Sequence, residues 1–307
     1  MSAAVAVVDW GTSSFRVWLL DAAGNVLAER RSGEGMLTAS KVPGGFSAVL
    51  EASLDAMQAE KKLPAIICGM AGARTGWIEA PYVDVPAALS DVLGGAIKVP
   101  SIARDVRIVP GMAQRQQGSP DVMRGEETQL AGAAAELGEG RHQVCMPGTH
   151  SKWVNVVDGQ VAGFSTFMTG ELYSVLSKNT TLAASFDAEQ RASAESPVFE
   201  DAFLAELGAG GDFGAKLFGL RAGKLLFDLQ PQDAANRLSG LLIGAEVASA
   251  RAGLGSGDTV ALVASGALRE LYAAALRLAG LVVNEIDADE AVLKGLYAAA
   301  RRNGLVG

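Results

Sequence analysis

The sequence has few histidine, cysteine and aromatic residues. Its 307 residues include 2 His, 2 Cys and 4 Trp, and aromatic residues make up 6% of the chain. The sequence has no cluster of Cys residues that would suggest a zinc site. Cys68 and Cys145 each end an apolar run. We therefore expect two buried thiols in a reducing compartment, and no disulfide.

An excess of basic residues is also missing. The chain has 26 Lys and Arg against 34 Asp and Glu, a formal net charge of −8. Because binding to the phosphate backbone needs a basic face, we expect no nucleic-acid partner. No basic segment precedes the first apolar run, which Asp9 interrupts, so the sequence does not predict a signal peptide. The apolar helix expected around Leu271–Val283 carries Arg277, so we expect no membrane span and a cytoplasmic location.

The stretch Val5–Leu20 predicts a strand, a tight turn and a second strand. Asp9 stands at the mouth of the turn, whose residues are Gly11, Thr12, Ser13 and Ser14. Backbone N–H groups and hydroxyls in a turn of this kind can cradle a phosphate group. Gly11, Thr12 and Ser13 are therefore candidate phosphate-binding residues.

The same pattern returns 137 residues later (148 − 11), around Gly148. Val144–Gly159 again predicts strand, Gly-Thr turn, strand and turn, and Gln160–Phe167 continues as a third strand. Two copies of one unit indicate an internal duplication. The second turn adds candidate residues, namely Gly148, Thr149, His150, Ser151 and Lys152.

Each half of the chain predicts three antiparallel strands, followed by helices that alternate with strands. This order predicts an α/β fold of two duplicated domains, with mixed sheets flanked by helices and a cleft between the domains. Pro110-Gly111 is the best candidate for the break. The expected domains are therefore residues 1–110, with the first turn, and 111–307, with the second.

Two phosphate turns with an Asp on the first resemble the sugar kinase, Hsp70 and actin superfamily, whose two ribonuclease-H-like (actin-like ATPase) domains clamp a nucleotide. Ser265–Ala267, after a buried strand, is similar to its adenosine-binding turn, and Glu290–Ala299 to its last inter-domain helix. The resemblance implies ATP and Mg²⁺ as cofactors, with Gly266 in the nucleotide site. Asp9 is the implied Mg²⁺ carboxylate, because the second copy has Met146 in its place.

Stretches across nearly the whole chain carry a closer resemblance. They are Asp9–Gly11, Gly76–Trp77, Ala80–Tyr82, Val85–Ala87, Val122–Leu130, Met146–His150, Lys152–Val154, Met168–Leu172 and Leu238–Ser249. They resemble the 2-keto-3-deoxygalactonate kinase (2-dehydro-3-deoxygalactonokinase) family. This resemblance implies ATP-dependent phosphorylation of the terminal C6 hydroxyl of 2-dehydro-3-deoxy-D-galactonate, in galactonate catabolism.

The catalytic candidates are Asp9 and the pair Glu126 and Glu127. In related sugar kinases a Gly-Asp pair at this place supplies the general base for the sugar hydroxyl. The resemblance carries that role to Glu126, with Glu in place of Asp, and Glu127 stays open as the alternative. Two carboxylates that stabilise a helix N-terminus are the structural explanation of the same pair.

A sugar acid needs cationic or N–H partners for its carboxylate and polar groups for its hydroxyls. The candidates by position are Arg16, Glu34, Arg74, Trp77, Arg124, Thr169 and Glu171. Any of the arginines can instead be structural, and core packing is the more frequent use of an aromatic such as Trp77.

Two alternatives stay open. One is a kinase for another sugar acid, such as the gluconate epimer, because the stereochemistry of one hydroxyl is not visible in a sequence. The other is an ATP-switched protein of the actin or Hsp70 type that is not a kinase. The expected partners are ATP and a small sugar acid, and a homodimer is left open.

Overall fold

The computed structural model describes residues 2–100, 102–187, 190–208 and 212–307. By their internal contacts the residues divide into two compact units. The first comprises Met1–Arg141, Val156–Gly163 and Ala288–Gly307, and the second comprises His142–Asn155 and Phe164–Asp287. The expected boundary at Pro110-Gly111 differs from this division, because strand and helix contacts hold residues 111–141 in the first unit. The two-domain assignment by residues 1–110 and 111–307 stays a prediction.

The first unit is built on a sheet whose strands have the order β3-β2-β1-β4-β8-β7. β1 pairs antiparallel with β2 and parallel with β4, so the sheet is mixed as predicted. Its apolar residues are buried because helices and loops cover them; Trp10, Phe15, Val49 and Ile67 belong to one core cluster. The strands are β1 (Val5–Trp10), β2 (Phe15–Leu20), β3 (Val26–Ser32), β4 (Ala65–Gly69), β7 (Ile97–Lys98) and β8 (Val106–Ile108).

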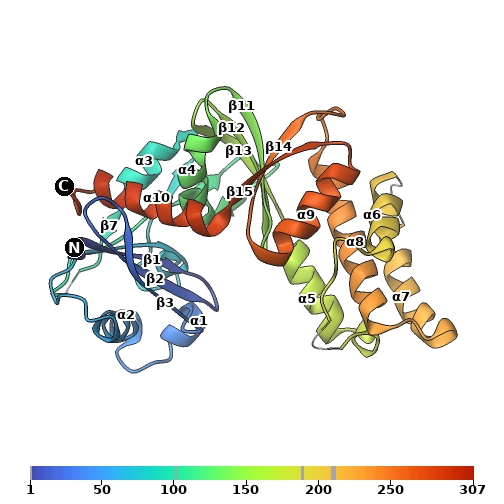
Figure 1. Ribbon diagram of the computed structural model, residues 1–307, viewed down its shortest axis with the longest axis horizontal. Helices are drawn as coiled ribbons and strands as arrows, with labels where there is room; N and C mark the ends of the chain where they lie inside the picture. The colour runs from blue at the N-terminus through green and yellow to red at the C-terminus, as the bar shows by residue number, and fades with distance from the viewer. Residues whose placement is uncertain (1, 101, 188–189, 209–211) are drawn as a thin grey trace. The chain divides into compact units, whose positions relative to one another are not determined.

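The helices of this unit include a closely packed pair, α4 (Glu126–Leu137) and α10 (Ala288–Arg302), which lie side by side in Figure 1. A Cβ atom on Gly132 would lie 1.8 Å from the Ala291 carbonyl oxygen, and one on Gly295 would lie 1.9 Å from the Thr128 carbonyl oxygen. The two glycines therefore permit this backbone contact. The other helices are α1 (Met36–Ala39), α2 (Gly45–Ala56), the 3₁₀ helix η1 (Met70–Gly72) and α3 (Leu89–Gly94).

A small sheet of order β10-β9-β5 was not predicted. Its strands are β5 (Tyr82–Asp84), β9 (Gly111–Gln114) and β10 (Asp121–Met123). The sequence of Asp121–Gln129 predicts the opening of a helix that lasts to about Leu137. In the structure β10 occupies the start of that run, and the helix α4 begins only at Glu126. Strands of three or four residues give too short an alternation to be recognised by pattern.

The second duplicated sheet has the order β15-β14-β11-β12-β13-β6. From β13 to β15 this is the same sequence of neighbours as from β3 to β8 in the first sheet, and the two central pairs, β11 with β14 and β14 with β15, are parallel. The predicted duplication is thus present in the topology. The strands are β11 (Arg141–Met146), β12 (Ser151–Val157), β13 (Gln160–Phe167), β14 (Thr259–Ala264), β15 (Val282–Asp287) and β6 (Ala87–Ala88).

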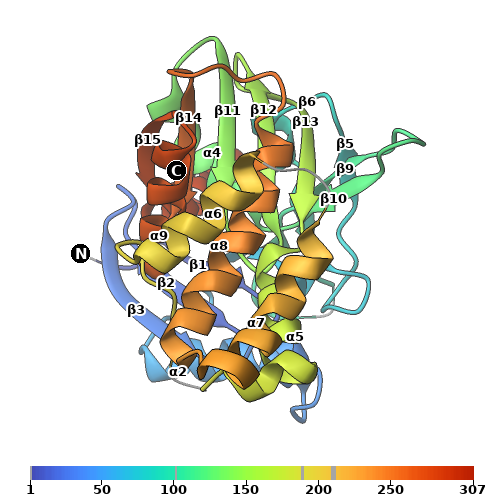
Figure 2. The same ribbon diagram turned by 90° about the vertical axis from the view of Figure 1, so that its right-hand side faces the viewer.

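The helices of the second unit stand together in Figure 2, where α6 crosses α8 at close range. Gly240 and Gly244 on α8 lie against the backbone of Phe199 and Phe203 on α6, which explains the small residues of that helix. None of the described helices is long and apolar enough to cross a membrane. The helices are α5 (Thr169–Asn179), the 3₁₀ helix η2 (Thr181–Ser185), α6 (Pro197–Gly208), α7 (Phe213–Phe227), α8 (Pro231–Ala250) and α9 (Gly266–Leu278).

Candidate active site

The turn between β1 and β2 keeps its backbone close to two other segments. The Gly11 N–H donates to the Ser14 carbonyl oxygen at 2.8 Å, and a Cβ atom on Gly11 would lie 2.6 Å from Ser14 Oγ. A Cβ atom on Gly35 would lie 2.5 Å from Ser14 N, so the start of α1 packs directly on the turn. Thr12 and Ser13 are exposed at the tip. The turn is thus rigid in its backbone and open at its hydroxyls.

Asp9 pairs across the hairpin with Arg16, as the strand register requires. Arg16 Nη2 donates to Asp9 Oδ2 at 2.6 Å, and the same guanidinium also pairs with Asp289 at the start of α10. On the other side the Cys68 thiol donates weakly to Asp9 Oδ1, with a sulfur–oxygen distance of 3.8 Å. Burial, together with the charge of Asp9, raises the pKa of that thiol, so Cys68 is inert.

The start of α4 lies beside the Asp9 carboxylate. A Cβ atom on Gly69 would lie 3.5 Å from Asp9 Oδ1, and one on Gly125 would lie 3.4 Å from Gly69 Cα. Gly125 has a φ of +106°, a backbone conformation that strongly favours glycine. The predicted Gly125-Glu126-Glu127 motif and Asp9 are therefore brought together within one unit.

The two adjacent glutamates have different surroundings. Glu127 is 0% exposed, and its Oε2 and Oε1 accept hydrogen bonds from the Gly125 N–H at 2.7 Å and the Thr128 hydroxyl at 2.9 Å. Burial and the charge of Glu126 raise the pKa of Glu127 to about 8, so it is mostly neutral at pH 7. Glu126 is partly exposed, and its Oε2 accepts from the Arg124 N–H at 3.0 Å. Of the two glutamates, Glu126 is in contact with solvent and Glu127 is not.

The Arg124 side chain is held by contacts within the first unit. Its Nη2 donates to the Ala80 carbonyl oxygen at 2.8 Å, and the guanidinium lies 4.4 Å from the centre of the Tyr82 ring. Its Nε and Nη1 atoms are buried without a hydrogen-bond partner. A Cβ atom on Gly72 would come within 2.7 Å of Nη1, so Gly72 makes room for the group.

The other candidate substrate residues of the first unit have diverse positions. Trp77 stacks on Phe46, with ring centres 6.1 Å apart, at the edge of the main core. The Glu34 carbonyl oxygen accepts from the Trp10 indole at 3.1 Å, and its carboxylate accepts from the Ser32 hydroxyl at 3.0 Å. Arg74 is exposed just after η1.

The second phosphate turn packs against the start of α5. A Cβ atom on Gly170 would lie 2.4 Å from the Gly148 carbonyl oxygen, and the Glu171 N–H donates to the Thr149 carbonyl oxygen at 2.9 Å. His150 Nε2 lies 2.6 Å from Glu171 Oε2, with both side chains partly exposed. Gly148, Thr149, His150 and Glu171 thus form one contiguous group.

The residues after this turn point into the unit. Lys152 is only 4% exposed, and its Nζ donates to the Thr166 hydroxyl at 2.9 Å. The hydroxyls of Ser151 and Thr169 both donate to the buried carboxylate of Glu246 on α8, the first at 2.6 Å. Glu246 is a site residue that sequence reasoning missed. Its only signal was an acidic residue inside an otherwise apolar and small-residue helix.

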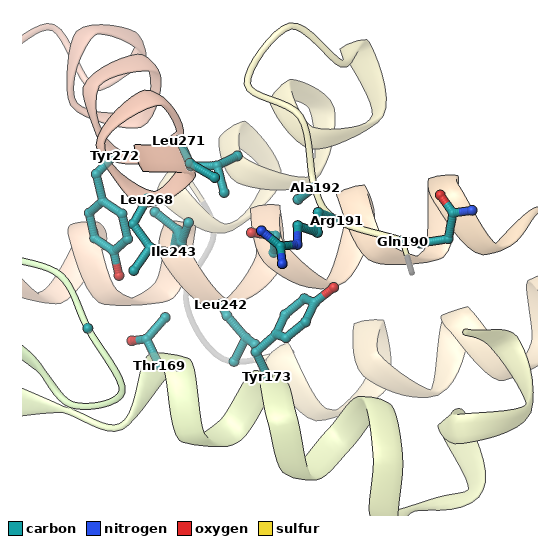
Figure 3. A pocket seen from close by; sticks show the side chains of 14 residues that line it. Thr169, Tyr173, Gln190, Arg191, Ala192, Leu242, Ile243, Leu268, Leu271 and Tyr272 are labelled. Atoms are coloured by element: carbon teal, nitrogen blue, oxygen red, sulfur yellow. The ribbon is translucent and has the colours of Figure 1, made fainter. Parts of the chain in front are cut away.

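A cavity of about 270 Å³ lies next to the second turn, within the second unit (Figure 3). Gly148, Thr169 and Gly170 line one side, and Ala267 and Leu268 at the start of α9 line another. The predicted phosphate turn and the predicted adenosine turn therefore meet at one pocket; Gly266 itself has a φ of +59° at the helix start. The sequence did not indicate the remaining lining residues, which are Tyr173, Gln190, Arg191, Ala192, Ser239, Leu242, Ile243, Leu271 and Tyr272.

The described residues contain no group of three or more His, Cys, Asp or Glu side chains that could hold a metal ion.

Comparison with known proteins gives a consistent result. The 2-keto-3-deoxy-galactonokinase family model matches residues 9–299. The chain belongs to this family. A Rhizobium meliloti protein named "Probable 2-dehydro-3-deoxygalactonokinase DgoK1" is 54% identical over 96% of both chains, and the Escherichia coli 2-dehydro-3-deoxygalactonokinase is 34% identical over 98% of both. Membership makes the chain a kinase, which is a transferase, and excludes the alternative of an ATP-switched protein without kinase activity.

Solved structures support the fold. The crystal structure of a 2-dehydro-3-deoxygalactonokinase homologue from Sinorhizobium meliloti matches with a TM-score of 0.92, 54% identity, and coverage of 97% of this chain and 98% of that one. An activator of 2-hydroxyisocaproyl-CoA dehydratase from Clostridium difficile, solved with ADPNP, matches with a TM-score of 0.53 over 98% and 96% of the chains. At 13% identity this second likeness concerns the fold alone. The expected actin-like ATPase fold is confirmed.

Proposed function

We propose that this kinase transfers the γ-phosphoryl group of ATP to the terminal C6 hydroxyl of 2-dehydro-3-deoxy-D-galactonate. The products are ADP and the 6-phosphate, in galactonate catabolism, and the hydroxyl proton passes to a base. The observation that carries the proposal is the 54% identity, over 96% of both chains, to the relative named for this activity.

Glu126 is the proposed general base. A base must reach the substrate hydroxyl and be ionised at the working pH. Glu127 meets neither condition, because it is 0% exposed and its pKa is raised to about 8 by burial and by the charge of Glu126. Glu126 stands in the first turn of α4 beside Asp9, where a carboxylate also interacts favourably with the helix dipole.

Asp9 is the proposed Mg²⁺ residue, and its surroundings fit that ion. Mg²⁺ in kinases is commonly bound through one or two carboxylates and the substrate phosphates, and not by an all-protein cage. Asp9 Oδ1 meets only a weak thiol donor, while Arg16 holds Oδ2. A bound Mg²⁺ would neutralise phosphate charge at this point, and the Arg16 ion pair keeps the carboxylate oriented towards the turn.

We assign the nucleotide to the two turns and the cavity. The exposed hydroxyls of Thr12, Ser13 and Thr149 are the proposed phosphate contacts, and the backbone of Gly11, Gly148, His150 and Ser151 completes the two turns. The adenosine occupies the cavity beside Gly266, whose side walls are mostly apolar and so favour a flat purine ring. The Lys152 ammonium group donates to Thr166, so we do not assign it a phosphate contact. Lys152 contributes to the proposed site by holding the strand that follows the second turn.

We divide the predicted substrate residues into those that contact the substrate and those that support the site. Arg74, which is exposed, is the preferred partner for the substrate carboxylate, and Glu34 and Glu171 are proposed contacts to the substrate hydroxyls. Thr169, whose hydroxyl donates to Glu246, is proposed to support the site. The other three candidates are proposed to support the site without touching the substrate, because each already packs against a neighbour. Arg16 pairs with Asp9, Arg124 lies over Tyr82 and Trp77 stacks on Phe46.

A cytoplasmic location is part of the proposal and rests on the substrates, because ATP is a cytoplasmic co-substrate. A homodimer stays a prediction, which light scattering on the purified protein measures directly.

A coupled ADP assay over a panel of sugar acids tests the function. We expect ADP release that requires the sugar acid, with the highest kcat/KM for the galactonate compound. A higher kcat/KM for the gluconate epimer would show that this epimer is the preferred substrate and would still be consistent with a sugar-acid kinase. ADP release at the same rate without any sugar acid would overturn the proposal.

A further inference from the structure

The Glu246 carboxylate accepts four hydrogen bonds in the interior of the second unit. Glu246 is 2% exposed. Its Oε1 accepts from the Ser151 hydroxyl at 2.6 Å and from the Trp153 indole at 2.8 Å. Its Oε2 accepts from the Tyr272 hydroxyl at 2.7 Å and from the Thr169 hydroxyl. These bonds hold the carboxyl group from both of its oxygens.

No cationic side chain neutralises this carboxylate within the part of the chain that the structure describes. Each of its donors has a single polar hydrogen, and each directs that hydrogen to Glu246. Burying an unpaired charge is costly, and here hydrogen bonds alone compensate for it. Loss of any one of the four donors would leave a buried carboxyl oxygen with fewer hydrogen bonds. The Glu246 side chain therefore holds the segments that carry these donors in fixed positions.

The donors come from three elements, two of which line the proposed nucleotide cavity while the third follows the turn beside it. Ser151 and Trp153 begin β12 directly after the second phosphate turn, and Thr169 begins α5, which packs on that turn. Tyr272 belongs to α9, whose first turn follows Gly266. Thr169 and Tyr272 also line the cavity, and Figure 3 shows them on the same side of it.

We propose that Glu246 is a positioning residue for nucleotide binding, which locks the second phosphate turn, the start of α5 and the wall of the adenosine pocket into one geometry. This inference rests on the proposed nucleotide site. It assigns Thr169 to the support of that site through its bond to Glu246.

The matched control is Glu206, a second buried carboxylate of the same unit. It lies on α6, is 5% exposed and pairs with Lys216 at 2.8 Å. It does not line the nucleotide cavity. Glu206→Gln therefore reports the general effect of neutralising a buried acid in this unit, without disturbing the cavity.

The test measures the dissociation constants of ADP and adenosine by titration calorimetry. In Glu246→Gln, the amide nitrogen must face either Ser151 and Trp153 or Thr169 and Tyr272, which are donors. We expect the Kd for ADP to rise about tenfold or more, and to stay within about twofold in Glu206→Gln. We also expect the KM for the sugar acid to change less than the KM for ATP.

Two milder variants separate the halves of the pocket and guard against misfolding. Tyr272→Phe keeps the ring that lines the cavity and removes one hydrogen bond, so it should weaken both adenosine and ADP. Ser151→Ala loosens the phosphate turn, so it should weaken ADP and leave adenosine unchanged.

Equal ADP affinity in Glu246→Gln and Glu206→Gln, with lowered melting temperatures in both, would overturn the proposal and leave Glu246 as a stabilising residue only. Unchanged affinity in both Tyr272→Phe and Ser151→Ala would also overturn it. Neither measurement needs the sugar acid. If the proposed substrate is wrong, the ADP-release assay will show it and the binding test remains valid. If the unmodified protein does not bind ADP, the proposed nucleotide site is wrong.

Discussion

Glu126 and Glu127 are neighbours in the chain, yet Glu126 is partly exposed and Glu127 is buried, so Glu126 is the residue that we propose as the base. Glu126→Gln keeps the size of the side chain and removes its ability to accept a proton. We expect kcat to fall by about 100-fold or more, the usual contribution of a general base. The Kd for ADP should stay unchanged, which calorimetry measures beside the coupled assay.

The control for this variant is Glu127→Gln, which replaces an acid that is mostly neutral at pH 7 by a neutral amide. Its kcat should fall by less than about tenfold. If instead Glu127→Gln lost activity and Glu126→Gln kept it, the base would be Glu127.

The raised pKa of Glu127 also affects stability. Burial and the charge of Glu126 raise it from an ordinary value of 4.5 to about 8, so the folded chain binds a proton that the unfolded chain has released. This stabilisation is complete below pH 4.5 and is lost as the pH rises through 8. The free energy of unfolding should therefore fall between pH 5 and pH 8, and fall less steeply in Glu127→Gln. Urea denaturation at both pH values measures the difference; equal slopes in the two proteins would contradict the assignment.

At the residue scale, the sequence predicted local features well and long-range partners poorly. Asp9, Gly11 and Gly125 were recognisable because turn chemistry is local. Glu246 was missed as a site residue because its partners Ser151 and Trp153 lie 95 and 93 residues away. The inward direction of Lys152 depends on which face of β12 is covered, and no local pattern decides that.

At the element scale, the contact of α4 with α10 depends on two glycines. Gly132→Ala would place a methyl group 1.8 Å from the Ala291 carbonyl oxygen, so the helices must separate. We expect a loss of stability of about 1–3 kcal/mol, as for other overpacked contacts. Thermal unfolding measures it.

Gly214→Ala on α7 is the matched helical control, because among the described residues nothing beyond its chain neighbours and its own helix lies within 4 Å of the added methyl group. Alanine favours a helix over glycine by about 1 kcal/mol, so this variant should be neutral or more stable. Equal effects of the two substitutions would show that helix propensity, not the close crossing, accounts for Gly132.

The longer elements were predicted from their periodicity, as was the short strand β8, whereas several other short strands were not predicted. The hairpin strands β1, β2, β11 and β12 and the closing helix α10 agree with the expected ranges. The two-residue strands β6 and β7 exist only through pairing with β13 and β8, and a partner distant in sequence leaves no local pattern.

At the scale of the whole molecule, a ligand that binds only the folded chain stabilises it. ADP with Mg²⁺ at a hundred times its Kd should add about 2.7 kcal/mol to the free energy of unfolding. Removing Mg²⁺ with a chelator should reduce this gain and abolish phosphoryl transfer. Without nucleotide the melting temperature should not respond to the chelator, because the described residues hold no cluster of metal ligands. Calorimetric melting measures all of these, and a chelator effect on the nucleotide-free protein would indicate a structural metal.

The duplication was the part of the architecture most accessible from sequence, since both copies keep the same neighbour order from the third strand of the hairpin unit to the last parallel strand. The extent of each unit was less accessible. The helix α10 belongs to the first unit although it lies at the far end of the chain. A local break in composition such as Pro110-Gly111 cannot reveal that a distant segment joins the same unit.

The end strand of the first sheet has a consequence outside catalysis. β3 is mostly exposed and carries Glu29, Arg30 and Arg31 in succession. An end strand offers backbone donors and acceptors to any extended chain that approaches it, and charged side chains discourage that approach. We therefore expect these three charged residues to discourage the pairing of β3 with another extended chain, an effect that does not depend on phosphate transfer.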